Sequence, residues 1–134
     1  MEKDHQLTPF FTKLAEYADS GTVSHDVPGH KLGQIPNEML DYAGPKMFKL
    51  DANAPRGLDN LNRPTGVIKE AAELMADAFG AEKAYFLTGG TTMGILAMIM
   101  SVCRAKEKII LPRNVHKSAI NALILSGAVP VFVQ

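Results

Sequence analysis

Apolar residues recur every three to four positions in two stretches of the chain, and this spacing predicts two amphipathic helices. We expect the first over Pro9 to about Ser20, capped by Thr8 and ended by Gly21. The second is expected over about Thr65 to Phe79, with Gly80 as its terminator. Its apolar face consists of Val67, Ile68, Ala71, Ala72, Met75, Ala78 and Phe79.

After Gly80, short apolar runs alternate with helical patterns. The predicted strands are Ala84–Leu87, Lys108–Pro112 and Val129–Val133, and the predicted helices are about Thr92–Cys103 and about Lys117–Ser126. This alternation favours an α/β fold, in which a mostly parallel sheet is flanked by helices. The helix from Thr92 is apolar almost all round, so we expect it to lie between the sheet and another layer. Pro130 suits only the start of the last strand or a sheet edge.

Between the two amphipathic helices lies a long segment, Thr22 to Pro64, with little periodicity. Its prolines are Pro28, Pro36, Pro45, Pro55 and Pro64, and its apolar residues include Leu40, Tyr42, Met47, Phe48 and Leu50. Irregular stretches of this length are uncommon inside compact domains unless they are functional. We expect a covering segment, anchored by those apolar residues, that crosses a subunit boundary or the mouth of a site.

The stretch Ala84–Gly94, which reads AYFLTGGTTMG, has the layout of a phosphate cradle. Gly89 and Gly90 allow a tight turn, and the amides and hydroxyls of Thr91 and Thr92 are expected to point at an anion near the helix start. The stretch is not a Walker loop, since no lysine follows its last glycine, and adjacent glycines do not match the dinucleotide fingerprint. The alternative is a turn whose glycines serve packing alone.

A second candidate site is the loop Arg113–Ser118, which follows the predicted strand ending at Pro112. Ligands gather at the carboxyl ends of parallel strands, so this loop and the Gly89–Thr92 turn are expected on the same side of the sheet. His116 is suited to stack on an aromatic ligand or to move a proton. The alternative is that Asn114 or Ser118 caps the helix and His116 hydrogen-bonds a carbonyl.

The run HDVPGHK, residues 25–31, brings two histidines and an aspartate together. No further histidine follows at ligand spacing, so we expect no metal there. The favoured interpretation is that His25 and His30 hydrogen-bond backbone groups and pin the turn, with Lys31 as a solvated charge.

Composition narrows the classes of protein. The chain has 14 basic and 14 acidic residues in 134, and this balance gives no indication of nucleic acid or an anionic membrane as partner. The start, Met1–His5, lacks the apolar core of a signal peptide, and the longest apolar run, Ile95–Met100, is too short to cross a bilayer. We therefore expect a cytoplasmic protein. Its one cysteine, Cys103, is expected to be a buried hydrophobe.

Four ordered motifs resemble a known family. They are HDVPGHK, LDANAPRGLDNLNRPTGVIKEA, FGAEKAYFLTGGTTMG and PRNVHKSAINALILSGAVPVF. In order and spacing they resemble the opening part of the Orn/Lys/Arg decarboxylase major-domain family, whose members are pyridoxal-phosphate enzymes of the aspartate-aminotransferase fold (fold type I). The resemblance covers Thr8 to Gln134 and is nearest to the short, biosynthetic-arginine-decarboxylase-like branch. It implies an N-terminal helix and irregular arm over residues 1–64 and the first part of the large domain over residues 65–134.

The resemblance also implies roles for particular residues. Gly90, Thr91 and Thr92 are expected to hold the cofactor phosphate, and His116 to stack on the pyridine ring. The turn with His30 and Lys31, together with the segment Asp51–Leu61, is expected near the site or a dimer contact. The sequence departs from the family pattern at Ala52, Asn53, Asn60, Asn62 and Ile95, which leaves the phosphate cradle intact.

The implied function is decarboxylation of a basic amino acid (arginine, lysine or ornithine) to CO2 and a polyamine-pathway amine, in a homodimer or larger assembly. The Schiff-base lysine of the family lies in a Ser-x-His-Lys motif that we expect downstream of Gln134. We therefore expect an N-terminal fragment that is inactive and aggregation-prone alone. The alternatives are another fold type I enzyme, an aminotransferase or aldolase, and a non-catalytic module that binds a phosphate ligand.

Overall fold

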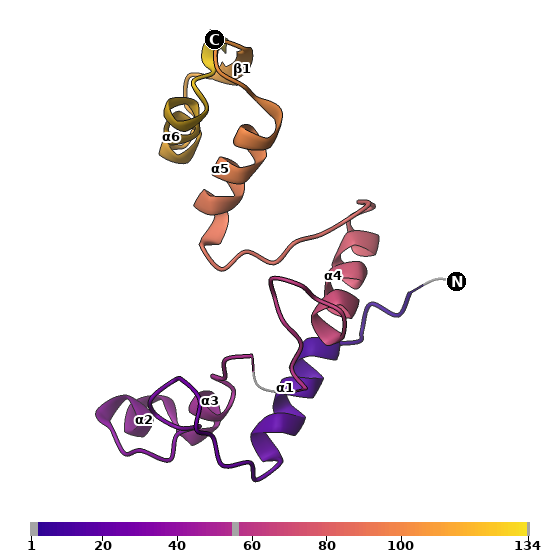
Figure 1. Ribbon diagram of the computed structural model, residues 1–134, viewed down its shortest axis with the longest axis vertical. Helices are drawn as coiled ribbons and strands as arrows, with labels where there is room; N and C mark the ends of the chain where they lie inside the picture. The colour runs from indigo at the N-terminus through magenta and orange to yellow at the C-terminus, as the bar shows by residue number, and fades with distance from the viewer. Residues whose placement is uncertain (1–2, 55–56, 134) are drawn as a thin grey trace. The chain divides into compact units, whose positions relative to one another are not determined.

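The computed structural model describes residues 3–54 and 57–133, and the chain divides into two compact units, Met1–Phe86 and Leu87–Gln134 (Figure 1). The boundary at residues 64/65 stays a prediction.

The first unit is helical. Its elements are α1 (Pro9–Asp19), α2 (Glu38–Ala43), α3 (Pro45–Lys49) and α4 (Val67–Ala78). Helices α1 and α4 pack together, and both were predicted from their apolar periodicity. Gly21 and Gly80 follow them with φ of 72° and 62°, left-handed values that glycine adopts without strain. Leu32, Leu58, Ile68 and Ala76 are the buried apolar residues of this unit.

Thr8 stands at the N-cap position of α1, as predicted, and its carbonyl accepts the backbone N–H of Thr12 at 2.8 Å, but its side chain makes no capping hydrogen bond. Its backbone, at φ −125° and ψ 64°, is outside the extended conformation usual for a cap, and its hydroxyl lies 3.2 Å from the hydroxyl of Thr12.

The segment predicted as irregular contains the two short helices. Asn37 begins α2, because its side-chain oxygen accepts the backbone N–H of Leu40 at 2.9 Å. Of the expected anchors, Leu40, Phe48 and Leu50 are half-buried. Tyr42 and Met47 are 96% and 65% exposed, so they bury too little surface to act as anchors within the described residues. Pro55 lies outside the described residues.

The second unit is α/β. It comprises α5 (Gly90–Val102), β1 (Lys108–Pro112), α6 (Lys117–Ser126) and β2 (Val129–Val133), and these strands and α6 have the predicted bounds. The strands are parallel, in register from Lys108 opposite Val129 to Pro112 opposite Val133. Pro130 lies next to the start of β2, opposite Ile109.

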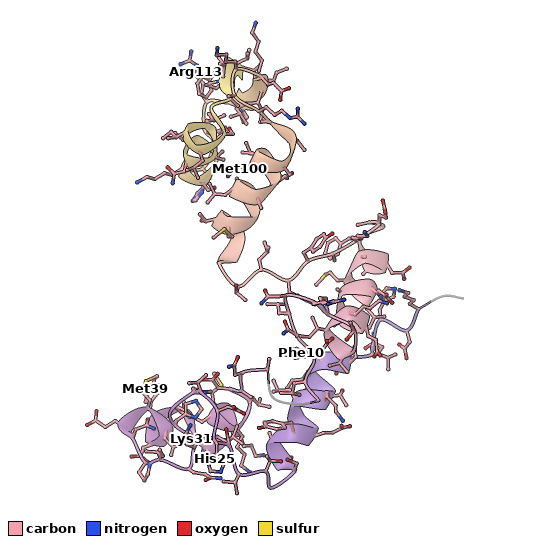
Figure 2. The ribbon with its side chains drawn as sticks, in the orientation of Figure 1. Phe10, His25, Lys31, Met39, Met100 and Arg113 are labelled. Atoms are coloured by element: carbon pink, nitrogen blue, oxygen red, sulfur yellow. The ribbon has the colours of Figure 1, made fainter. Side chains whose placement is uncertain are left out.

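One face of the strand pair packs on the helices. Ile99, Ala119 and Ala122 are buried between α5 and α6, with Ile95, Leu96, Cys103, Ile109 and Val115 packed around them. The other face bears Ile110 and, opposite it, Val131, which are 70% and 40% exposed. On α5, Met93, Met98, Met100 and Val102 are also exposed (Figure 2 labels Met100). Within the described part of the chain, α5 is therefore covered on one side, where the sequence predicted cover on both.

The predicted strand Ala84–Leu87 is not a strand in the structure. Its side chains are largely exposed, with Tyr85 at 77%. An extended segment becomes a strand only by exchanging backbone hydrogen bonds with a neighbour, and the described residues form a sheet only from β1 and β2.

Helices α5 and α6 end at the same edge of the sheet. The backbone N–H of Lys106, just after α5, donates to the carbonyl of Gly127, just after α6, at 2.8 Å. Beside this contact, the N–H of Val129, the first residue of β2, donates at 2.8 Å to the carbonyl of Glu107, the residue before β1. Helix α6 begins after the carboxyl end of β1 and leads into the amino end of β2, and α5 leads into the amino end of β1.

None of the helices in the described residues is long and apolar enough to cross a membrane.

Candidate functional site

The start of α5 is a turn built on glycine. Gly89 stands at the cap position, and Gly90 has a left-handed φ of 68°. A Cβ added at Gly90 would meet no atom within 4 Å, so the space beside this residue is open. The N–H groups of the first turn of a helix lack intrahelical acceptors, and the helix dipole favours an anion near them. Thr91 and Thr92 lie in this turn and are exposed.

The neighbouring glycines serve packing. A Cβ on Gly89 would lie 2.9 Å from Cβ of Met93, and one on Gly94 would lie 2.5 Å from Cδ1 of Leu87. Close packing explains why these two positions need glycine. Gly90 has no such neighbour, and glycine is favoured there because of its left-handed φ. The packing interpretation therefore applies to Gly89 and Gly94, and that the turn holds a phosphate stays a prediction.

His116 is the N-cap residue of α6. Its Nδ1 accepts the backbone N–H of Ser118 at 3.2 Å and lies 2.9 Å from Ser118 Oγ. The alternative in which Asn114 or Ser118 caps the helix is therefore wrong, because the imidazole itself occupies the capping position. Ser118 is buried, whereas His116 is exposed at the carboxyl end of β1.

The glycine turn and the His116 loop belong to two helices that pack together, and that both loops lie on the same side of the sheet stays a prediction. Val115 packs with Ile95 around the core between α5 and α6. Val115 precedes His116, and Ile95 is in the second turn of α5. The second unit thus carries a left-handed glycine, the free amides of a helix start and an imidazole on two helices that pack together.

The histidine turn of the first unit is a separate structure. His30 Nδ1 accepts the N–H of Gly33 at 3.2 Å, and its Nε2 lies 3.0 Å from Asp51 Oδ2. The ring packs edge-on against Phe48, with centroids 4.9 Å apart, and the His30 side chain is only 13% exposed. His30 thus pins the turn, as predicted.

Lys31 is not simply a solvated charge. Its Nζ donates to the backbone carbonyls of His25 (3.3 Å) and Asp26, and Figure 2 labels Lys31 and His25 in this turn. That prediction is wrong because the turn presents two carbonyls to the ammonium. His25 contributes its backbone carbonyl to this contact. That His30 and Lys31 line a ligand site stays a prediction.

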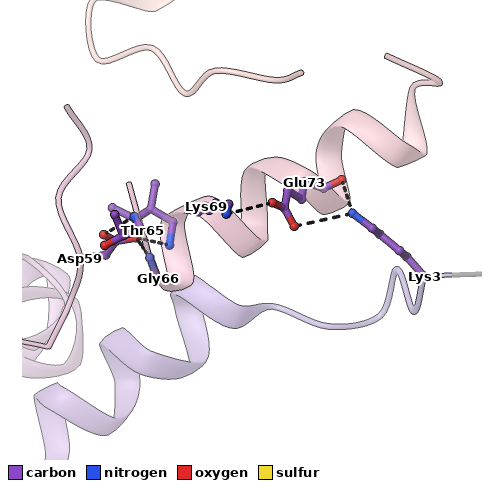
Figure 3. A network of polar contacts seen from close by, with 7 residues as sticks. Lys3, Asp59, Thr65, Gly66, Lys69 and Glu73 are labelled. Carbon is purple, nitrogen blue, oxygen red and sulfur yellow. Dashed lines mark hydrogen bonds and ion pairs between the residues drawn. The ribbon is translucent and has the colours of Figure 1, made fainter. Parts of the chain in front are cut away.

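Asp59 is the polar residue that the sequence reasoning missed. Its carboxylate accepts the backbone N–H groups of Asn60, Thr65, Gly66 and Ile68 at 2.8 to 3.1 Å, and so caps α4 (Figure 3). Burial raises the pKa of Asp59, but these hydrogen bonds outweigh it and lower the pKa to about 2. The only signal in the sequence was an aspartate well before the helix, outside the usual capping spacing.

The remaining ion pairs lie at the surface. Glu73 on α4 lies 3.9 Å from Lys3 and 3.7 Å from Lys69, all with half-exposed side chains (Figure 3). Exposed ion pairs of this kind contribute little to stability. Among residues 3–54 and 57–133, no three His, Cys, Asp or Glu side chains gather closely enough to hold a metal ion.

Comparison with known proteins places these features in a family. The sequence model of the family described as Orn/Lys/Arg decarboxylase, major domain, matches residues 8–134. The chain is 43% identical to the arginine decarboxylase of Bacillus anthracis over 95% of its length, and 31% identical to the ornithine decarboxylase of Haemophilus influenzae over 98%. The structure of the constitutive lysine decarboxylase of E. coli matches 96% of the chain with a TM-score of 0.82 and 28% identity.

The match covers a small part of each relative. The chain spans 26% of the Bacillus anthracis protein, 19% of the Haemophilus influenzae protein and 19% of the E. coli lysine decarboxylase chain. These comparisons confirm the fold type I, α/β expectation and the family resemblance. The chain belongs to the Orn/Lys/Arg decarboxylase family and corresponds to the first part of its major domain.

Proposed function

We propose that this chain is the N-terminal part of the major domain of a pyridoxal-phosphate-dependent decarboxylase of a basic amino acid. One observation carries the proposal: α5, which begins at the left-handed Gly90, and α6, which His116 caps, pack together in one α/β unit. The identity of 43% to an arginine decarboxylase supports arginine as substrate ahead of lysine and ornithine. The product amine would enter polyamine synthesis.

The residues at the start of α5 fit a phosphate group. The space beside Gly90 is open, so an anion can approach the backbone closely. The amides of Thr91 and Thr92 are first-turn donors, and their exposed hydroxyls are further hydrogen-bonding groups. Gly90, Thr91 and Thr92 are thus the residues that would hold the phosphate.

His116 would orient the ring of the same cofactor. Its Nδ1 is engaged with Ser118, so the ring is held in one orientation while its remaining surface is exposed. Bound pyridoxal phosphate supplies the electron sink that amino-acid decarboxylation requires. The contribution of this chain is to fix the position of phosphate and ring, which lowers the cost of orienting the reacting bond.

The 134-residue chain alone would not decarboxylate. The family resemblance implies a Schiff-base lysine in a Ser-x-His-Lys motif, and these residues contain no such motif. Lys117 follows His116 but is preceded by Asn114 at the serine position. In the proposal, the active form is a homodimer or larger assembly in the cytoplasm.

The test is CO2 release by the full-length protein from L-arginine, L-lysine and L-ornithine, measured beside amino-group transfer to a keto acid. We expect CO2 release from one of these substrates, dependent on pyridoxal phosphate. Amino-group transfer without CO2 release would favour an aminotransferase. Binding of phosphate esters with neither reaction would favour the non-catalytic module.

A matched pair of variants tests the phosphate site. Thr91→Val and Thr92→Val each remove a hydroxyl and keep the shape of the side chain. We expect at least one of them to weaken pyridoxal-phosphate binding about tenfold, the effect of losing a hydrogen bond to a charged group. Thr88→Val, just before the turn, is the control and should change the affinity little.

A further inference from the structure

Ser118 makes two contacts with one atom of His116. Its backbone N–H donates to Nδ1 at 3.2 Å, and its Oγ lies 2.9 Å from the same Nδ1. The backbone contact determines which atom is the donor in the hydroxyl contact. Because Nδ1 accepts the N–H, it carries no proton, so the hydroxyl of Ser118 must be the donor to it.

This arrangement fixes the chemical state of the imidazole. A neutral histidine carries its proton on one ring nitrogen, and the partner of the other nitrogen determines which one. With Nδ1 accepting, the proton is on Nε2. A flipped ring would place a carbon where Nδ1 now lies, and both contacts with Ser118 would be lost. Residue 118 therefore selects both the tautomer and one of the two ring orientations.

The burial of Ser118 makes the hydroxyl contact costly to lose. Ser118 is 1% exposed, beside the buried Ala119 and Ala122, whereas His116 is exposed. A buried hydroxyl without a hydrogen-bond partner is destabilising, and no buried side-chain N or O atom of the described residues lacks one. The hydroxyl thus stays directed at Nδ1 while the rest of the ring stays open to a ligand.

We propose that Ser118 is the positioning residue of His116, and that its Oγ–H holds the imidazole in the Nε2–H tautomer and in one ring orientation toward the pyridine ring. The inference rests on the proposed function only for the identity of the ligand that the ring faces. The tautomer and its dependence on Ser118 are properties of this chain's own residues, and they are measurable without cofactor.

The experiment is long-range 1H–15N NMR of the full-length protein labelled with 15N-histidine, which distinguishes the two neutral tautomers. His116→Gln identifies the signals of His116 among those of the other histidines, three of which lie in this chain. We expect the Nε2–H tautomer alone in the unmodified protein. This first measurement needs no substitution at Ser118, so it decides the tautomer even where a variant fails to fold.

The variants separate the hydroxyl from the backbone contact. Ser118→Ala removes Oγ and keeps the N–H, and we expect the ratio of minor to major tautomer to rise about fivefold. Ser118→Cys keeps the volume but offers only a weak donor, so it should resemble alanine; Ser118→Thr keeps the hydroxyl and should restore a single tautomer. Ser126→Ala removes a hydroxyl from the same helix that donates to the Leu123 carbonyl, and it should leave the His116 signals unchanged.

Two results overturn the inference: an Nδ1–H or mixed tautomer in the unmodified protein, or an unchanged tautomer in Ser118→Ala. Absorbance titration with pyridoxal phosphate keeps this failure distinct from failure of the proposed function. Binding of the cofactor with an unchanged tautomer in Ser118→Ala refutes only the role of Ser118. The expected tautomer without cofactor binding refutes only the proposed function.

Discussion

The carboxylate of Asp59 accepts the backbone N–H of Gly66 at 2.8 Å and thereby joins the irregular segment to the first turn of α4. Since Asp59 itself has a left-handed φ of 69°, the chain adopts an uncommon conformation to bring this carboxylate to the helix start. The contact organises the entry to the helix that packs on α1.

Asp59→Ala should lower the free energy of unfolding by about 1 to 2 kcal/mol, the usual cost of losing a helix cap. Urea unfolding monitored by circular dichroism measures this. Asp26→Asn, an exposed carboxylate of the same unit, is the control and should have little effect. An Asp59→Ala variant as stable as the unmodified chain would show that the cap contributes nothing.

The same residue predicts a dependence of stability on pH. The pKa of Asp59 is lowered from 3.8 to about 2, so its stabilising contribution is complete above the ordinary value and is lost as the pH falls toward 2. Asp59→Asn should reduce the slope of unfolding free energy against pH in that window. An identical slope in the two proteins would contradict the assignment.

Alanine substitutions at two glycines of the second unit distinguish the cost of backbone strain from the cost of steric crowding. Gly90 and Gly127 both have a left-handed φ, 68° and 71°, but a Cβ on Gly127 would lie 3.1 Å from Cβ of Ala105, whereas one on Gly90 would meet open space. Gly90→Ala should cost about 1 kcal/mol of stability from conformation alone, and Gly127→Ala should cost more. Equal losses of stability in thermal or urea unfolding would show that Ala105 moves aside at no measurable cost.

His30 and Asp51 should contribute unequally to the first unit, although they form one pair. Asp51 is 66% exposed, so Asp51→Ala should cost less than about 1 kcal/mol. His30→Ala also removes the acceptor of Gly33 N–H and the contact with Phe48, and should cost about 1 to 3 kcal/mol. The single variants and the double variant, measured by urea unfolding, test this order; a larger loss from Asp51→Ala would reverse it.

The bare face of the strand pair predicts self-association of the 134-residue chain. Ile110 and Val131 lie side by side on this face, one on each strand, and both are exposed. We expect concentration-dependent association in analytical ultracentrifugation, reduced by Ile110→Lys, because charges on exposed strands oppose edge and face pairing. A monodisperse chain that Ile110→Lys leaves unchanged would contradict this.

Local pattern was sufficient for much of the fold. The bounds of β1, α6 and β2 could be predicted from apolar runs and from Gly127. These three elements are close in sequence, and they pair their backbone hydrogen-bonding groups and bury their apolar side chains against one another. The stretch Ala84–Leu87 has the same apolar character, but the residues that the structure describes offer it no neighbouring strand. Pairing is a non-local property, and a pattern alone cannot supply the partner.

Capping contacts were the least predictable part. Thr8 has a suitable side chain but an unsuitable backbone, whereas Asp59 reaches α4 from outside the usual spacing. At the candidate site, the sequence identified His116 and the side of the sheet on which it lies. It did not show that His116 is itself the helix cap, because that depends on the side-chain contact with Ser118.

The most direct measurement is a structure of the full-length protein determined with pyridoxal phosphate bound. We expect the phosphate within hydrogen-bonding distance of the amides of Thr91 and Thr92, beside Gly90, with the pyridine ring stacked on His116. A cofactor bound elsewhere, or one whose phosphate and ring contact neither of these two loops, would contradict the account.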